Sequence, residues 1–334
     1  MLKIDFATTK NLPKYRIIID AVRLLLQNGE LQKGDKLPSC NALRKQYNLS
    51  QDTVYMAYNE LKKLGIIISK AGMGYYVQNT SIDDKHKVFV LFDNLSAYKE
   101  ELYEAFKLTM KGKGSEQIFF HHNNPTVFNS LIKNAVGEFS DFVIMPIDEK
   151  SCIDTLELLP SNNVFLLDKA PKPLKQIYSY VCQDFESDIY QLIIQNDNLF
   201  QKYNRMILML QNDKNHFKEI IKGFRLASKK LNVPCDVIFK SAEFQLQRGD
   251  LVVVVEDKDL VNIVSSAEKL NLELGKEIGI ISYNETPLKK IAAGGITTIS
   301  TDFAAMGTNM AEMILSGKKQ KIHNPFIINL RKSV

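Results

Sequence analysis

The chain has 334 residues, of which 45% are hydrophobic and 24% are charged, and it contains four cysteines and no tryptophan. This is the composition of a globular protein with two domains, or three. The sequence contains no apolar run of about 18 residues and no basic-then-apolar leader, so we expect no membrane-spanning helix, no secretory signal and a cytoplasmic location. The cysteines are widely spaced, which favours neither a disulfide framework nor a metal site.

The net charge of +5 is unevenly distributed. Residues 1–80 carry twelve Lys or Arg and six Asp or Glu, which is +6, so the remaining residues sum to −1. This division indicates a small domain that approaches a polyanion, attached to a neutral body. A solvated basic face on an ordinary small domain is the alternative.

The segment 1–77 follows a helical pattern that ends in a hairpin. Apolar spacing predicts a helix over 14–28. Ser39 is expected to cap a short helix that ends near Tyr47, and Ser50 to cap another that continues to about Leu64. The short connection between the last two predicts a helix-turn-helix. Two short strands around a glycine-rich turn, over 65–78, predict a β-hairpin wing.

We expect a linker over 78–87, which is polar and lacks apolar periodicity. Beyond it, apolar runs alternate with helical stretches. The expected strands are 88–92, 142–145, 164–167, 206–210, 237–239, 251–255 and 278–282. Continuous apolar runs between helices predict parallel strands buried on both faces, hence a doubly wound α/β domain over 88–334. Ligands bind outside the carboxyl ends of such strands.

The segment 1–77 resembles a GntR-type winged helix over its whole length. The matching segments are the LPKYRIIID opening, GELQKGDKLPS, TVYMAYNELKKLG and the GMGYYV wing. The resemblance implies a double-stranded operator DNA partner, with the helix after Ser50 in the major groove and hydroxyls and basic side chains on phosphates. The expected DNA-binding residues are Ser39, Asn41, Arg44, Lys45, Ser50, Gln51, Asp52, Thr53, Tyr55, Lys70, Gly72 and Gly74.

Two positions depart from the family pattern, in which arginines often stand where this chain has Asn41 and Gln51. Asn and Gln suit adenine through bidentate hydrogen bonds, so we expect a palindromic operator richer in A·T pairs.

Residues 87–334 resemble the effector domain of LacI/GalR regulators and periplasmic sugar-binding proteins, a type I fold of two α/β lobes with a ligand cleft between them. The order of FDNLSAYKEELYEAF, VFLLDK, YSYVCQDFESDIYQLI, IIKGFRLA, EIGIISYNE and ITTISTDFAAMG carries this resemblance. Carried over position by position, it implies effector contacts from Ser96, Tyr98, Asp168, Lys169, Asp184, Glu256, Asp257, Asn284 and either Thr301 or Asp302. Carboxylates and amides suit sugar diols, and Tyr98 suits the apolar face of a pyranose.

One mismatch affects the ligand. Three residues before the "GF" glycine, where the family usually has an arginine, this chain has Ile220. Lys218 or His216 is expected to substitute for that arginine. Asp168 and Asp184 each have an alternative role as caps of the following helix. The pair His121-His122 has no partner at metal-ligand spacing, so no metal is expected.

The sequence lacks GxGxxG after a strand, GxxxxGK[ST], GxSxG and HExxH, so we expect no enzyme and no cofactor. The expected function is a homodimeric transcriptional regulator, a repressor of carbohydrate-utilisation genes that a small sugar between the lobes releases from DNA. One alternative is a sugar-metabolising enzyme with an appended nucleic-acid-binding module. Another is a binding protein whose winged helix makes protein contacts.

Overall fold

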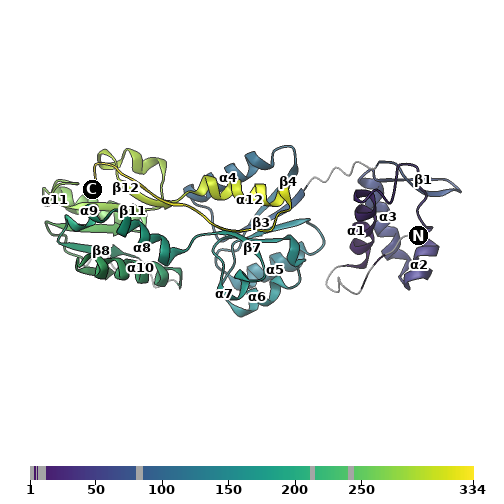
Figure 1. Cartoon of the computed structure of the whole chain (residues 1–334), viewed down its shortest axis with the longest axis horizontal. Helices are drawn as coiled ribbons and strands as arrows, with labels where there is room; N and C mark the ends of the chain where they lie inside the picture. The colour runs from purple at the N-terminus through teal and green to yellow at the C-terminus, as the bar shows by residue number, and fades with distance from the viewer. Residues whose placement is uncertain (1–3, 5, 7–12, 80–85, 211–214, 240–243) are drawn as a thin grey trace. The chain divides into compact units, whose positions relative to one another are not determined.

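The computed structural model in Figure 1 describes residues 4, 6, 13–79, 86–210, 215–239 and 244–334. Its N-terminal part is a bundle of three helices followed by a two-stranded antiparallel hairpin. These elements are α1 (Lys14–Gln27), α2 (Cys40–Tyr47), α3 (Gln51–Lys63), β1 (Ile67–Lys70) and β2 (Gly74–Val77). The sequence prediction of three helices and a wing is therefore confirmed.

Local chemistry sets the ends of the two short helices. The Ser39 hydroxyl accepts a hydrogen bond from the Ala42 amide at 3.1 Å, and the Ser50 hydroxyl accepts one from the Thr53 amide at 3.2 Å. Each serine satisfies a backbone donor that the first helical turn leaves unpaired. Asn48 ends α2 in the left-handed conformation, at φ 50°. Asparagine tolerates this conformation, and the chain can turn there into α3.

The core of this bundle joins α1, α3 and the inner face of the hairpin. Ile18 and Val22 of α1 and Leu61 of α3 are fully buried, and Ile67 and Val77 of the hairpin are almost so. One apolar stripe on each helix therefore positions the opposite, polar face of α3 toward solvent.

The first α/β lobe is built on a six-stranded sheet in the order β13-β7-β6-β5-β3-β4. The strands are β3 (His86–Phe92), β4 (Gly114–Phe120), β5 (Asp141–Ile144), β6 (Val164–Asp168), β7 (Ser179–Cys182) and β13 (Lys321–His323). The helical elements that follow β3 to β6 in the chain are α4 (Ala97–Met110), α5 (Pro125–Ala135), α6 (Lys150–Leu156), η1 (Ser161–Asn163) and α7 (Lys172–Lys175). Strand β3 pairs in parallel with both β4 and β5.

The second α/β lobe is built on a sheet in the order β14-β12-β11-β10-β8-β9, in which only the edge strand β14 is antiparallel to its neighbour. Its strands are β8 (Arg205–Met209), β9 (Cys235–Ile238), β10 (Asp250–Val254), β11 (Gly279–Tyr283), β12 (Thr297–Thr301) and β14 (Phe326–Asn329). Its helical elements are α8 (Phe185–Gln195), α9 (Asp197–Gln201), α10 (Asn215–Leu231), α11 (Asp257–Lys269), η3 (Pro287–Lys290) and η4 (Ala292–Gly294).

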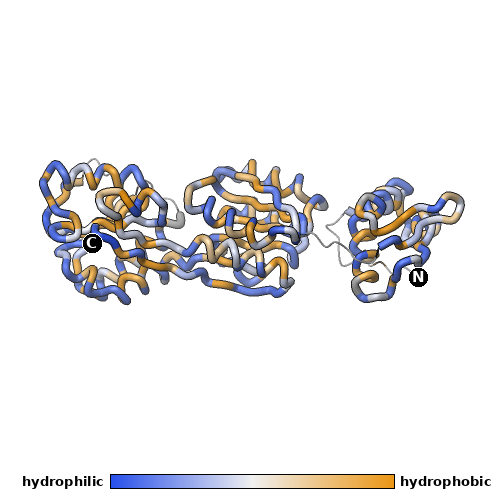
Figure 2. The backbone as a smooth tube through the Cα atoms, turned by 90° about the horizontal axis from the view of Figure 1, so that it is seen from above, coloured by the Kyte–Doolittle hydropathy of each residue, from blue (hydrophilic) through white to orange (hydrophobic). Residues whose placement is uncertain are grey.

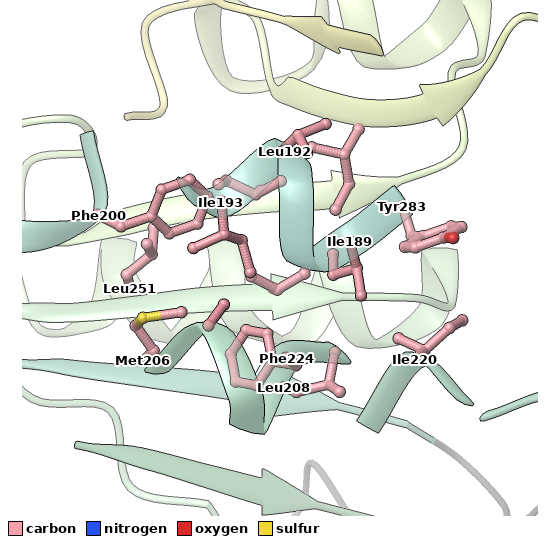
Figure 3. Close-up of a cluster of buried hydrophobic side chains, with 14 of the residues drawn as sticks. Ile189, Leu192, Ile193, Phe200, Met206, Leu208, Ile220, Phe224, Leu251 and Tyr283 are labelled. Carbon is pink, nitrogen blue, oxygen red and sulfur yellow. The ribbon is translucent and has the colours of Figure 1, made fainter. Parts of the chain in front are cut away.

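Alternate residues of these strands face two separate cores. Leu208, which Figure 3 labels, and Val253 pack with α8 and α10. Ile207 and Val252 pack with α11 on the other face. Because both faces are covered, the central strands β8 and β10 carry apolar residues on both faces, and Figure 2 shows hydrophobic segments in orange within the lobes. The predicted doubly wound α/β class is confirmed.

Close approach between helices depends on two glycines. Gly307 lies in α12 (Phe303–Ser316), and a Cβ at this position would overlap the backbone of α4 at Leu102. A Cβ at Gly223 in α10 would likewise overlap the backbone of α8 at Glu186. The chain passes from the first sheet to the second after β7, back after β12 by way of α12, and forward again after β13. Within the described ranges, no helix is long and apolar enough to cross a membrane.

Candidate DNA interface and effector site

The N-terminal turn of α3 presents polar side chains to solvent. Gln51 and Asp52 are exposed and Tyr55 is 43% exposed, whereas Val54 and Ala57 on the same helix are fully buried. These are the side chains expected to read base edges, and their exposure leaves them accessible to a partner.

The helix α2 adds further polar groups to the N-terminal bundle. Asn41 and Lys45 are exposed and Arg44 is half-buried. The Ser50 and Thr53 hydroxyl oxygens lie 2.7 Å apart, so one donates to the other and a single hydroxyl hydrogen stays available to a phosphate. Ser39 is exposed beside the N-terminus of α2, where backbone N–H groups favour an anion.

The wing contributes two lysines that share one aromatic ring. The Nζ atoms of Lys70 and Lys36 lie 4.8 Å and 5.7 Å from the centroid of the Tyr76 ring. The turn between the strands contains Gly72 and Gly74, with φ of 70° and 102°, which only glycine adopts without strain. The sequence prediction included Lys70 and both glycines but not Lys36 or Tyr76. A bridge between Lys36 and Tyr76 extends the hairpin, and it joins positions too far apart for a local pattern to indicate.

The second group of polar residues gathers where the chain passes between the two sheets. The Tyr98 ring packs against the Phe303 ring, with centroids 4.8 Å apart. The Asp302 carboxylate beside it caps α12 by accepting from the Ala305 amide at 2.8 Å. Tyr98 thus contacts Phe303, the residue next to Asp302, and both Tyr98 and Asp302 are among the residues expected to bind effector.

Asn324, between β13 and β14, links this pair to the end of β7. Its amide nitrogen Nδ2 donates to the Thr301 hydroxyl at 2.8 Å and to the Asp302 carbonyl at 2.7 Å. Its backbone N–H donates to the Cys182 carbonyl at 2.9 Å. Only 3% of Asn324 is exposed. No sequence pattern indicated this residue, because an asparagine before a proline is typical of an ordinary turn.

Gln183, the next residue after Cys182, reaches the end of β6. Its backbone N–H donates to the Asp168 carbonyl at 2.9 Å, and its Nε2 donates to the Asp168 carboxylate at 2.5 Å. Asp168 has φ of 69°, a left-handed conformation that is uncommon outside glycine. This double contact holds Asp168 in place at the carboxyl end of its strand.

Tyr283, at the end of β11, completes the group. It lies at the margin of the core in Figure 3, and 4% of it is exposed. Burial raises the pKa of its phenol well above the ordinary value, and the nearby charges of Asp188 and Asp168 raise the pKa further. The phenol is thus neutral, and the charges of two carboxylates act on it. We call Tyr98, Asp168, Gln183, Tyr283, Asp302 and Asn324 the Asn324 cluster.

Several buried polar atoms in and beside this cluster have no hydrogen-bond partner among the described residues. Among the described residues, they include Oε1 of Gln183, the phenol oxygen of Tyr283, Oδ1 of Asn324 and the hydroxyl of Ser96. Proteins pair almost all buried polar atoms, so each of these four atoms calls for a partner that the described residues do not supply, such as a ligand or an ordered water.

Comparison with known families identifies both parts of the chain. Residues 14–77 match the model of the bacterial regulatory proteins of the gntR family, and residues 199–333 match the periplasmic binding protein-like domain. The chain therefore combines a gntR-type helix-turn-helix domain with a periplasmic-binding-protein-like domain.

One relative aligns along nearly the whole chain. The arabinose metabolism transcriptional repressor of Halalkalibacterium halodurans is 20% identical, over 92% of this chain and 90% of the relative. An uncharacterised HTH-type transcriptional regulator of Bacillus subtilis is 38% identical over 22% of this chain. The chain spans only 15% of that regulator's length, so this second similarity concerns the gntR-type domain alone.

Solved structures share the fold of the two lobes. A LacI family transcriptional regulator from Lactobacillus casei with bound glucose superposes with a TM-score of 0.61 at 13% identity, over 74% of this chain and 99% of that chain. The expected two-lobed fold of LacI-type regulators is thus confirmed.

Several expected effector residues of the periplasmic-binding-protein-like domain have other contacts. Asp257 pairs with the buried Lys289 at 2.9 Å, and Lys289 also donates to the Asn284 carbonyl. Asp184 caps α8 by accepting from the Ser187 amide at 3.3 Å, the alternative considered for it. Glu256 precedes α11 without a side-chain capping bond.

The expected replacements for the missing arginine do not join the Asn324 cluster in the described contacts. Lys218 is exposed on α10, where it lines a groove with Lys222, Arg225 and Lys229. The side chain of His216 lies outside the described residues. Ile220 is buried in the core of the second lobe. Lys169 is half-buried directly after Asp168.

No three His, Cys, Asp or Glu side chains within the described residues are grouped as metal ligands would be. His121 is fully buried, and its Nε2 lies 3.0 Å from the Met145 carbonyl oxygen, an acceptor to which it donates. His121 is therefore part of the protein interior.

Proposed function

We propose that this chain is a sequence-specific transcriptional regulator, a repressor of carbohydrate-utilisation genes that releases DNA when a small sugar binds at the Asn324 cluster. The observation that carries this proposal is the presence, in one chain, of a gntR-type domain with a polar recognition face and a LacI-type fold with unpaired buried polar groups. The full-length similarity to an arabinose metabolism repressor supports a sugar as the effector.

The proposed DNA contacts follow the exposure of the gntR-type domain. Gln51, Asp52 and Tyr55 read bases, and the hydroxyl and basic groups of α2, α3 and the wing hold phosphates. The regulator acts as a homodimer, so its two winged helices meet the half-sites of a palindromic operator.

The proposed switch is a difference in affinity. A sugar releases DNA only if it binds the arrangement that does not fit the operator more tightly than the one that does. The part of the predicted linker that precedes β3, residues 78–85, transmits that change to the winged helices.

Binding of duplex DNA by the full-length protein tests the proposal. Operators are first selected from random duplexes, and DNA release is then measured by fluorescence anisotropy with L-arabinose, D-glucose or trehalose. Release by one of these sugars supports the proposal. Failure to select any duplex contradicts the DNA-binding role, and selection without release by any sugar contradicts the effector role.

Two substitutions separate the proposed roles. Asp168→Ala should abolish sugar-dependent release and leave operator affinity intact. Asp168→Asn is the conservative variant, because asparagine also tolerates the left-handed conformation of this position. Equal loss of both properties would remove Asp168 from the effector site. Gln51→Ala should change the preferred operator bases without changing the salt dependence.

A further inference from the structure

Two side-chain amides of the Asn324 cluster are almost completely buried. Gln183 is 7% exposed and Asn324 is 3% exposed. Each amide has two N–H donors and one carbonyl acceptor, and in each only the nitrogen has a partner within the described residues. These two residues were not among the expected effector contacts.

The partners fix which way each amide points. The Nε2 atom of Gln183 faces a carboxylate oxygen of Asp168, which accepts and cannot donate when ionised. The Nδ2 atom of Asn324 faces the backbone carbonyl of Asp302, which is an acceptor only. An inverted amide would place two acceptor oxygens against each other at 2.5 Å and 2.7 Å, so the positions of nitrogen and oxygen cannot be exchanged in either amide.

The carbonyl oxygens are therefore held as acceptors that face no donor from the part of the chain that the structure describes. An unpaired buried acceptor destabilises the folded state, so each carbonyl calls for a hydrogen-bond donor that the described residues do not supply, such as a ligand hydroxyl or an ordered water. The Asp168 carboxylate and the Asp302 backbone carbonyl thus orient the amides of Gln183 and Asn324.

We propose that Gln183 and Asn324 bind the effector directly, each amide carbonyl accepting a hydrogen bond from a hydroxyl group of a neutral polyhydroxylated ligand. This inference rests on the proposed function, and it names the chemistry of that ligand. A carboxylate or phosphate oxygen cannot donate to either carbonyl, so a sugar acid or sugar phosphate does not place its charged group at these two positions. The Tyr98 ring beside Asp302 provides an apolar surface for the carbon skeleton of the ligand.

Calorimetric titration of the full-length protein tests this pairing. The probes are L-arabinose, D-glucose and trehalose, each compared with its singly deoxygenated analogues. The variants are Gln183→Met and Asn324→Leu, which keep the side-chain size and remove the carbonyl. Asn129→Ala is the matched control, because Asn129 in α5 also has a buried unpaired carbonyl but lies outside the cluster.

The wild type should bind a deoxy analogue about tenfold or more weakly than the intact sugar, when the missing hydroxyl is the one that faces one of the carbonyls. The corresponding variant should lose a similar factor for the intact sugar and bind the sugar and its deoxy analogue equally. The control variant should bind as the wild type does.

Each outcome is decisive. If a sugar binds the wild type and the two variants with equal affinity, or if no deoxy analogue binds the wild type more weakly, the inference is wrong and the proposed function stands. If a variant fails to fold, the deoxy series on the wild type decides the question alone. If no sugar binds the wild type, the proposed sugar effector is wrong and the inference falls with it.

Discussion

The ammonium group of Lys289 lies 2.9 Å from the backbone carbonyl oxygen of Asn284, inside the protein, where only 3% of the lysine is exposed. The same group donates to the Tyr283 carbonyl at 3.0 Å and pairs with the Asp257 carboxylate at 2.9 Å. One buried lysine therefore fixes the loop after β11 and holds it to the start of α11.

Replacing Lys289 with methionine should lower the free energy of unfolding by about 1–3 kcal/mol, because two carbonyl oxygens lose their donor. Urea denaturation measures the change. Lys276→Met is a control, since Lys276 is 72% exposed in its ion pair with Glu273 and its loss should not be measurable. If Lys289→Met changed the free energy of unfolding as little as Lys276→Met, the buried contacts of Lys289 would contribute nothing to stability.

The Asp188 carboxyl should make stability depend on pH. Burial raises the pKa of Asp188 from 3.8 to about 6, although a backbone hydrogen bond from Asp184 lowers the pKa in part. A carboxyl with a raised pKa in the folded state binds its proton more tightly there, so the stability it contributes is greatest below pH 4 and falls as pH rises toward 6.

The expected loss between pH 4 and pH 7 is about 1–2 kcal/mol, reduced by solvent screening because Asp188 is only partly buried. Unfolding free energies of the wild type and Asp188→Asn, measured at pH 4 and pH 7, isolate the contribution of Asp188 to this loss. The difference between the two proteins should shrink or reverse at low pH, and a difference that stays constant with pH would contradict the assignment.

Gly223 should tolerate no side chain. A Cβ at this position would overlap the Glu186 carbonyl and the Ile189 side chain, so Gly223→Ala must push α10 away from α8. Overpacking of this kind costs about 1–3 kcal/mol, and a gain in helix propensity offsets only part of the cost. Leu226→Ala, at a 44% exposed position on the same helix, should have a smaller effect on the urea midpoint. A neutral or stabilising Gly223→Ala would show that the two helices are not in close contact.

The sequence was sufficient for the elements that local pattern determines. The runs at 206–210 and 251–255 are apolar because the strands β8 and β10 are covered on both faces. The caps at Ser39 and Ser50 were predictable because their hydrogen bonds span three residues.

Elements that depend on distant partners were missed. Strand β4 contains Ser115, Glu116 and Gln117. An edge strand accommodates such polar residues, but a continuous apolar run, the signal used to predict strands, is absent there. Strand β12 begins with Thr297, which is fully buried. Its hydroxyl is satisfied there by donating to the Arg331 carbonyl, 34 residues away, at 3.1 Å.

The candidate site shows the same limit. Tyr98, Asp168 and Asp302 follow strands or begin helices, so the fold places them near the carboxyl ends of strands, as expected. Gln183 and Asn324 belong to distant parts of the sequence and come together only through the pairing of β13 with β7. No spacing rule connects them.

The outer face of the wing should contribute to DNA binding through two lysines. Tyr76 pairs with Ile68 across the hairpin and bridges to Lys36 on its other side, and Lys70 is paired with Gly74. Paired and alternate residues share one face of a sheet, so Lys36 and Lys70 stand on the same face, opposite the buried core.

If each ammonium binds one phosphate, Lys36→Ala and Lys70→Ala should each reduce the slope of log Kobs against log salt by about 1, because one fewer counterion is released. Non-specific duplex DNA suffices for this measurement, since phosphate contacts do not depend on sequence. Lys62→Ala is the matched control, because Lys62 is exposed near the C-terminal end of α3, away from the helix terminus expected to meet DNA. An unchanged slope for Lys36→Ala would restrict the DNA contact of the wing to Lys70 and its glycine turn, whereas equal reductions for both lysines would place the whole outer face on the phosphate backbone.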